Sequence, residues 1–322
     1  MKRNTAMIIT LVASIAINSV ADVTNISELP IAKFTVKVVS EDLTPVGNAN
    51  VSFGFGHSSA QGVTDANGLF TGEGHCEMSG IGSTINKQGY YLGFAATPIF
   101  RTFDKTLNQW MPWNETNTVI LRRIGNPVAL YAKKVQTDIP ILDQPCGYDL
   151  EKGDWVAPFG NGVKSDFIFT VHKEYKNRFN FNAEAKLTFS EPGAGLLAMA
   201  SPPIATNSIF RWDRSAPESG YVASCDLYIT NISQKITANF NSYRRDVGYF
   251  FRVRTLRHEG QIVSAHYGKI VGDISLDPRN SKTCTVIFTY YFNPIPNDQN
   301  LEWDTKKNLF INLSFMQSPR DP

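Results

Sequence analysis

The chain carries almost no net charge. Its 322 residues include 31 Lys plus Arg and 29 Asp plus Glu. Lys2 and Arg3 precede an apolar segment at the start of the chain, and without them the basic and acidic residues are equal in number. Proteins that bind nucleic acid or acidic membrane surfaces carry an excess of basic residues. We therefore expect no nucleic-acid partner and no polybasic membrane patch.

Long apolar stretches are absent beyond the N-terminus. The segment from Ala6 to Ile17 is apolar apart from Thr10 and Ser14, and a small-residue site ending at Ala21 follows it. It is shorter than the roughly 20 residues that cross a bilayer. Together with the two basic residues before it, this predicts a secretory signal cleaved after Ala21. The mature chain is then expected to lack a transmembrane segment and to be exported to the periplasm, the cell surface or the medium.

Cysteine is scarce, and its spacing excludes common metal sites. The four cysteines form no Cys-x-x-Cys pair and no Cys/His pattern typical of zinc. In an exported protein disulfides can persist. Cys225 and Cys284 both lie in strand-like runs, so we expect them as a possible disulfide; the alternative is that all four are buried thiols.

Recognisable catalytic signatures are also missing. The five histidines do not form the His-x-x-Glu pattern of a zinc carboxypeptidase. Residues 56–60, GHSSA, imitate a nucleophile elbow, but Ala60 replaces its last glycine and no helical pattern follows. Ser58 is therefore interpreted as a loop residue. We predict no catalytic residue, no metal and no cofactor.

The sequence does contain many short alternating runs separated by turn residues. Phe34, Val36 and Val38 share one face of such a run, as in a half-buried strand. No helical periodicity extends beyond about ten residues. We predict an all-β fold of two β-sandwich domains at residues 22–125 and 146–322, joined by a connector at 126–145. The second domain is expected to be a sandwich or jelly-roll-like.

Three motifs in the first half occur in an informative order. They are TPVGNANVSF (44–53), GVTDANGLF (62–70) and INKQGYY (85–91). This order resembles the carboxypeptidase regulatory-like, transthyretin-like β-sandwich of exported bacterial proteins, over about residues 30–125. The resemblance implies a small antiparallel sandwich with an accessory or spacer role. The segment 94–116, with Trp110 and Trp113, departs from that pattern. The second half resembles exported proteins of undefined function, and that likeness implies no chemistry.

Asp65, Asn67 and Gly68 are predicted to be turn residues. Asn-Gly readily takes positive φ in a hairpin, and an Asp just before it can accept backbone N–H bonds. A calcium site at Asp65 and Asn67 is the alternative, but it lacks the further carboxylates that the ion requires.

Two tryptophans of the second half stand beside charged residues. Trp155 follows Asp154, and Trp212 lies between Arg211 and Asp213. An indole next to hydrogen-bonding groups can hold a sugar, so these five residues are the candidate ligand site. The alternative is that both indoles fill the edge of a β core.

The second half also contains carboxylates that could catalyse the hydrolysis of a sugar bond. A glycosidase needs two of them facing each other across the sugar bond. The candidates are Asp149, Glu151, Asp154, Asp213 and Glu218.

Arg252 and Arg254 alternate with apolar residues, so both are expected on the solvated side of a strand, where they could grip a carboxylate.

The leading hypothesis is an exported, non-enzymatic binding or structural protein. Its second domain would recognise a polysaccharide or a cell-envelope protein. A carbohydrate-active hydrolase using carboxylates of the second domain is the alternative, and an assembly component that pairs through β-edges is a third class. The oligomeric state stays open at this stage.

Overall fold

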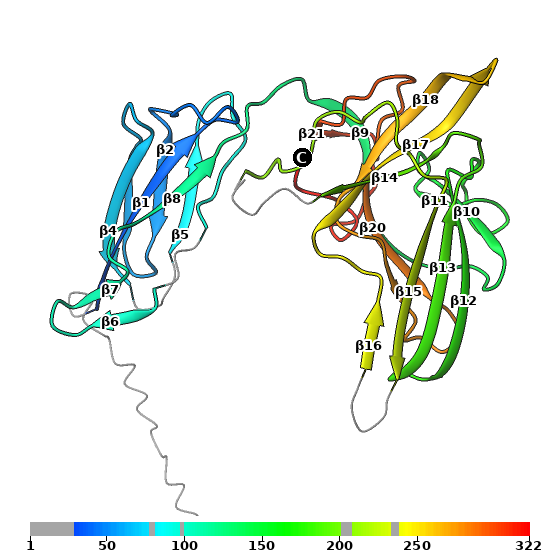
Figure 1. Cartoon of the computed structure of the whole chain (residues 1–322), viewed down its shortest axis with the longest axis horizontal. Coiled ribbons are helices and arrows are strands. Elements are labelled where there is room, and N and C mark those ends of the chain that lie inside the picture. The colour runs from blue at the N-terminus through cyan, green and yellow to red at the C-terminus, as the bar shows by residue number, and fades with distance from the viewer. Residues whose placement is uncertain (1–28, 77–80, 97–99, 201–207, 233–237) are drawn as a thin grey trace, which may run out of the picture.

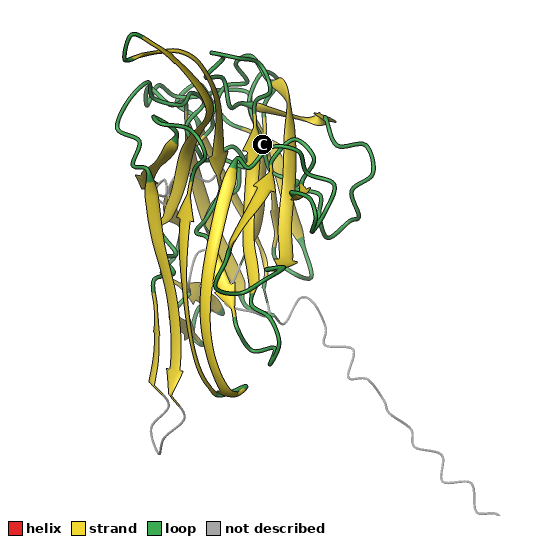
Figure 2. Cartoon of the chain, turned by 90° about the vertical axis from the view of Figure 1, so that its right-hand side faces the viewer, coloured by secondary structure: helices red, strands yellow, loops and turns green. Residues whose placement is uncertain are grey.

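The protein is all-β, as the sequence predicts. The computed structural model describes residues 29–76, 81–96, 100–200, 208–232 and 238–322. Within these ranges there are strands and loops but no helix (Figure 2), and the strands form two separate β-sandwiches (Figure 1). No helix in the described part of the chain could therefore span a bilayer. The predicted signal and its cleavage site at Ala21 lie outside the described residues.

The first sandwich packs two small sheets against each other. One sheet has the order β4-β1-β8, with the β6–β7 hairpin added at the start of β1, and the other has the order β3-β2-β5. Phe34, Val36 and Val38 are fully buried between the sheets, which confirms the predicted alternation. The strands are β1 (Ile31–Val39), β2 (Asn50–Gly54), β3 (Ser59–Val63), β4 (Leu69–His75), β5 (Gly82–Asn86), β6 (Thr102–Asp104), β7 (Gln109–Met111) and β8 (Glu115–Ile120).

The predicted turn exists, but it does not close a hairpin. Asp65 accepts hydrogen bonds from the backbone N–H groups of Asn67 (2.9 Å) and Leu69 (2.8 Å). Gly68 has a φ of +75°, and a Cβ there would collide with a carbonyl oxygen of β1. However, β3 pairs with β2 and β4 pairs with β1, so the turn carries the chain from one sheet to the other. The hairpin prediction was wrong because strand partners depend on distant segments.

Residues 100–116, the larger described part of the 94–116 segment, cover one end of the first sandwich. Its β6–β7 hairpin places Trp110 against Phe100 and Phe103, with ring centroids about 6 Å apart. The indole N–H of Trp110 donates to the Cys76 carbonyl at 2.7 Å. The unexpected tryptophan is thus part of the core edge.

The second sandwich packs a six-stranded sheet on a seven-stranded sheet. The six-stranded sheet has the order β11-β10-β12-β13-β15-β16, and the other has the order β14-β17-β18-β20-β9-β21, with β19 also paired to β20. Aromatic residues from both sheets fill the core between them. The strands are β9 (Val128–Asp138), β10 (Pro145–Asp149), β11 (Asp154–Trp155), β12 (Phe167–Asn177), β13 (Asn180–Thr188), β14 (Gly195–Ala200), β15 (Ser224–Ile232), β16 (Ala238–Asn241), β17 (Val247–His258), β18 (Gln261–Ile270), β19 (Ser275–Asp277), β20 (Thr285–Phe292) and β21 (Trp303–Asn308).

The connector predicted at residues 126–145 is largely a strand of the second sandwich. β9 pairs antiparallel with β20 over residues 131–138 and parallel with β21. Its alternation is hard to recognise because small Ala132 is one of the buried residues and Lys133 is half-buried. The Lys133 amine donates to the Gly153 carbonyl, so its charge does not exclude it from the interior. The second domain therefore begins near residue 128.

The two sandwiches contact each other through a polar junction. Glu302 is buried and accepts hydrogen bonds from the Tyr91 hydroxyl (2.7 Å) and the Gly125 N–H (2.8 Å). Phe210, from the loop between β14 and β15, stacks on the Tyr91 ring at 4.9 Å. A side chain of the second sandwich thus packs on a ring of the first.

Candidate functional site

The predicted tryptophan site is buried. Trp155 is 4% exposed and makes edge contacts with the rings of Tyr148 and Phe169. Trp212 is 9% exposed and covers Gly248 in β17. Their faces are therefore not available to a sugar, and the indoles instead complete two cores. The physical reason is that a large aromatic ring gains more free energy inside a sandwich than on its surface.

The charged neighbours of these tryptophans do not converge. Asp154 closes its own turn by accepting hydrogen bonds from the N–H groups of Trp155 and Asn161, both at 2.8 Å. Arg211 and Asp213 are exposed in the loop that carries Trp212. Trp212 and Trp155 pack in two different clusters of core residues. The structure therefore does not bring the five predicted residues together.

The predicted disulfide is absent. Cys225 and Cys284 are separate thiols that pack on the same core. Burial raises the pKa of the Cys284 thiol to about 12 and also raises that of Cys225. Both cysteines act as apolar core residues, which was the alternative interpretation.

Two of the five candidate catalytic carboxylates, Asp149 and Glu151, lie on an arginine instead of on a cleft, together with Asp166. Arg254 binds Asp166 through Nε (2.8 Å), Glu151 through Nη1 (2.6 Å) and Asp149 through Nη2 (3.4 Å). Burial raises the pKa of Asp149, but hydrogen bonds from four backbone N–H groups outweigh it and hold that pKa below its ordinary value. A glycosidase leaves space between its carboxylates for the sugar, and here the guanidinium fills that space.

Arg254 was expected on the solvated face, and the structure places it inside. Its φ is +53°, and the register of β17 against β18 shifts between Val253 and Leu256. This bulge reverses the alternation and turns the side chain inward. Asp166 was missed because no local pattern links it to an arginine 88 residues away.

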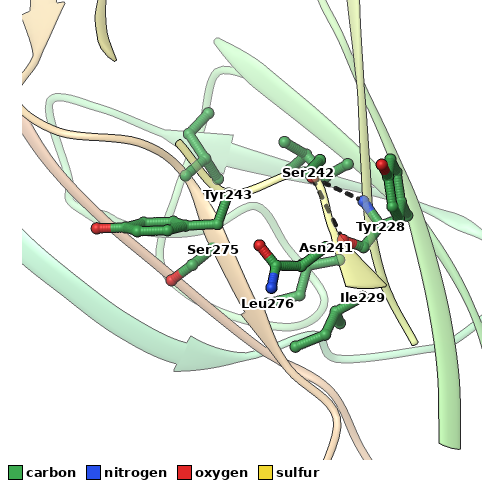
Figure 3. A pocket seen from close by; sticks show the side chains of 9 residues that line it. Tyr228, Ile229, Asn241, Ser242, Tyr243, Ser275 and Leu276 are labelled. Carbon is green, nitrogen blue, oxygen red and sulfur yellow. Dashed lines mark hydrogen bonds between the residues drawn. The ribbon is translucent and has the colours of Figure 1, made fainter. Parts of the chain in front are cut away.

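An uncharged groove lies where the second sandwich opens between β15, β16 and β19 (Figure 3). We call it the β15–β19 groove. It has a volume of about 300 Å³. Its lining residues are Leu227, Tyr228, Ile229, Asn241, Ser242, Tyr243, Ile274, Ser275 and Leu276.

Strand geometry produces the groove's apolar floor and polar rim. Ile274 and Leu276 point into the core, so Ser275 between them points outward. Asp273 fixes the rim, because its carboxylate accepts hydrogen bonds from the Arg244 N–H (2.6 Å) and the Ile274 N–H (2.8 Å). These bonds tie the residue after Tyr243 to the start of β19.

In Figure 3 the Tyr243 ring extends above Ser275, on the side of the groove opposite Tyr228. Its side chain lies on the same side as the Asn241 amide and the Ser275 hydroxyl, and it is 47% exposed. Tyr228 is equally exposed at 48%, but its ring points away from them. The groove thus combines one accessible ring, hydrogen-bonding groups and apolar side chains, without a charged residue.

A second hollow continues the groove. It has a volume of about 410 Å³, and both hollows are lined by Ile229 and Leu276. Phe179, 56% exposed, stands in this extension. Arg279 there is paired with Asp277, with Nε 2.7 Å from the carboxylate. The combined groove suits an elongated ligand with an aromatic contact at each end.

The described ranges contain no group of three or more His, Cys, Asp or Glu side chains placed to hold an ion. Sequence reasoning missed Tyr243 and Ser275 because they come from separate segments and form no motif.

Comparisons with known proteins give no family. No family model and no curated protein matches the chain. Among solved structures, a proposed carbohydrate-binding protein from Bacteroides uniformis is 8% identical, with a TM-score of 0.20 over 84% of this chain and 99% of that one. The major pilin subunit of Bacillus cereus is 10% identical, with a TM-score of 0.22 over 80% and 95%. Likenesses this weak carry no argument, and the resemblance of residues 30–125 to the carboxypeptidase regulatory-like domain stays a prediction.

Proposed function

We propose that the chain is an exported, non-enzymatic binding protein whose second sandwich holds a neutral polysaccharide in the β15–β19 groove. The observation that carries this proposal is the half-exposed Tyr243 ring, which lies with the Ser275 hydroxyl above an apolar floor. The C–H face of a sugar packs on an aromatic ring, while its hydroxyls bond to nearby polar groups. Export rests on the N-terminal sequence, which has the basic and apolar regions of a secretory signal.

The absence of charge in the first part of the groove favours an uncharged ligand. None of its nine lining residues is acidic or basic. A charged ligand would lose its hydration there without gaining an opposite charge. The same lining contains no carboxylate that could act as a general acid or base, so binding is favoured over hydrolysis.

Tyr243→Ala tests the proposal against a matched control, Phe159→Ala, at an exposed ring that lines neither hollow. The full chain and both variants are titrated with a panel of neutral glycans. We expect wild type and Phe159→Ala to bind the same glycan, and Tyr243→Ala to bind it about tenfold more weakly, because it loses the stacking surface. Equal loss in both variants would assign the effect to the fold. Failure of every neutral glycan to bind would refute the proposal.

A further inference from the structure

A larger and more polar cavity lies along the β17–β18 hairpin, from its middle to its turn. Its volume is about 710 Å³. Two arginines, Arg252 and Arg257, line it together with Glu218 and the amides Gln261 and Gln299. None of these residues lines the β15–β19 groove, so the cavity is a separate feature of the second sandwich.

Arg252 is held in a fixed position at the wall of this cavity. Only 9% of it is exposed. Nε donates to the Gly193 carbonyl at 2.9 Å and Nη1 to the Glu218 carbonyl at 2.6 Å, while the guanidinium lies 4.5 Å from the centre of the Tyr221 ring. Within the described part of the chain, no group accepts a hydrogen bond from Nη2. Backbone carbonyls therefore orient an arginine whose two Nη2 N–H groups remain available to a ligand.

The charge of the cavity suits a monoanion. Arg257 is exposed on the hairpin and uses Nη2 to bind the Gly260 carbonyl at 2.6 Å. Its charge and that of Arg252 are opposed only by the Glu218 carboxylate among the lining residues. Two positive groups against one negative group leave a single positive charge. This balance matches a carboxylate better than a phosphate, which carries close to two charges at neutral pH.

An extended peptide does not fit at this place. The outer edge of β18 beside the cavity is already occupied by Asn297, whose N–H and Nδ2 donate to the Ala265 carbonyl (2.8 Å) and the Val263 carbonyl (3.2 Å). Its side-chain oxygen accepts from the Ala265 N–H at 2.9 Å. An added strand would find no open backbone groups at these positions. The amides of Gln261 and Gln299 can instead bond to hydroxyls.

We infer that this cavity binds a carboxylated sugar, such as a uronic acid residue of an acidic polysaccharide, with Arg252 and Arg257 holding the carboxylate. The site goes beyond the proposed function, because it recognises the charge that the β15–β19 groove excludes. Arg252 supplies a fixed donor, and Arg257 closes the outer side of the site. Glu218 tunes the site by reducing its positive charge.

The test compares an unesterified oligogalacturonate with its methyl ester of the same length, using the full chain. We expect the acid to bind more tightly than the ester and to bind less tightly as salt is added. Arg257→Gln should weaken binding of the acid about tenfold, since it removes a charge-assisted contact. Glu218→Gln should strengthen binding several-fold, because it removes a repelling charge. Both side chains are exposed, so neither change is expected to disturb folding.

Other outcomes would overturn the inference. Equal affinity for acid and ester, no binding of the acid, or tighter binding of inorganic phosphate would each exclude a carboxylate site. Unchanged affinity in both variants would place the ligand elsewhere. The two proposals can fail separately, because Tyr243→Ala alters the binding of neutral glycans only, and Arg257→Gln alters that of the acid only.

Discussion

Two buried cations on adjacent strands of the second sandwich have opposite surroundings. Arg254 on β17 binds three carboxylates. Lys269 on β18 has no exposed surface, and its amine has no hydrogen-bond partner in the described part of the chain. The Lys269 amine lies between the rings of Phe210 and Tyr291, 5.0 and 5.1 Å from their centres. Carboxylates thus compensate the charge of Arg254, whereas the Lys269 amine contacts aromatic rings.

The two surroundings differ because a buried lysine can lose its proton, whereas a buried arginine cannot. Arginine stays charged in proteins, so burying it requires hydrogen-bond acceptors, and carboxylates compensate the charge best. Lysine can lose its proton when it is buried. Burial lowers the pKa of Lys269 to about 7; the nearby charge of Arg122 adds to this effect, and the Glu302 and Asp213 carboxylates oppose it. Near neutral pH, Lys269 can therefore be buried without a paired anion.

The two sites also differ in their position. The Arg254 cluster lies within the second sandwich, where it joins β17 to the segments around β10 and β12. Lys269 lies under Phe210, the ring that stacks on Tyr91 of the first sandwich. The Arg254 cluster is therefore expected to affect the stability of the second sandwich alone. Lys269 is expected to affect the junction between the two sandwiches as well.

The largest effect is expected from Arg254→Met. This substitution leaves Asp149 and Asp166 buried without their cation, and breaking a buried ion network from one side costs about 3–5 kcal/mol. Urea unfolding at pH 7 measures the loss in free energy. Arg211→Met, at an exposed arginine, is the matched control and should change stability by less than about 0.5 kcal/mol. Similar small effects in both variants would show that the cluster contributes nothing.

Lys269→Met should have the opposite sign. Replacing a buried, unpaired cation by an apolar side chain of similar volume is expected to stabilise the fold by about 1–4 kcal/mol at pH 6. The same urea unfolding experiment measures this gain. A large loss of stability would mean that the amine makes a contact that methionine cannot replace.

The gain from Lys269→Met should shrink as pH rises. The pKa of Lys269 is about 7 in the folded protein, against an ordinary value of 10.5. Between these values the unfolded chain binds more protons, so wild-type stability rises with pH by at most about 1.4 kcal/mol per unit. Below pH 7 the penalty for burying the charge is fully present. Comparing wild type with Lys269→Met from pH 6 to 9 isolates this residue, and a constant difference would show that its pKa is not lowered.

Local features of this fold were predictable from the sequence. The alternation of Phe34, Val36 and Val38 and the turn at Asp65 each depend on neighbouring residues. Features set by distant segments were not. The partners of β3 and β4, the bulge that turns Arg254 inward and the covering of Trp155 all depend on residues far away in the chain.

The same reasoning applies to the candidate site. The sequence predicted two tryptophans as ligand-binding residues, because an aromatic residue next to charged residues is a pattern that can be recognised locally. The accessible ring is that of Tyr243, which precedes two arginines and so shows the same local pattern, but that pattern does not tell an exposed ring from a buried one. Its role depends on the short strands β16 and β19, which leave the sandwich open beside it.

The smallest effect is expected at the junction, from Tyr91→Phe. This change removes one donor to the buried Glu302 carboxylate, which keeps the N–H groups of Gly125 and Asn126 at 2.8 and 3.0 Å. With two donors left, the cost should be about 1–2 kcal/mol in thermal or urea unfolding. Tyr90→Phe is the matched control on the neighbouring residue, where the ring still packs under Arg123 and no change is expected. If Tyr91→Phe also has no effect, Glu302 is satisfied without the first sandwich. The junction is then held by the stacking of Phe210, the Glu41–Arg214 ion pair and the hydrogen bond from Arg122 to the Trp212 carbonyl.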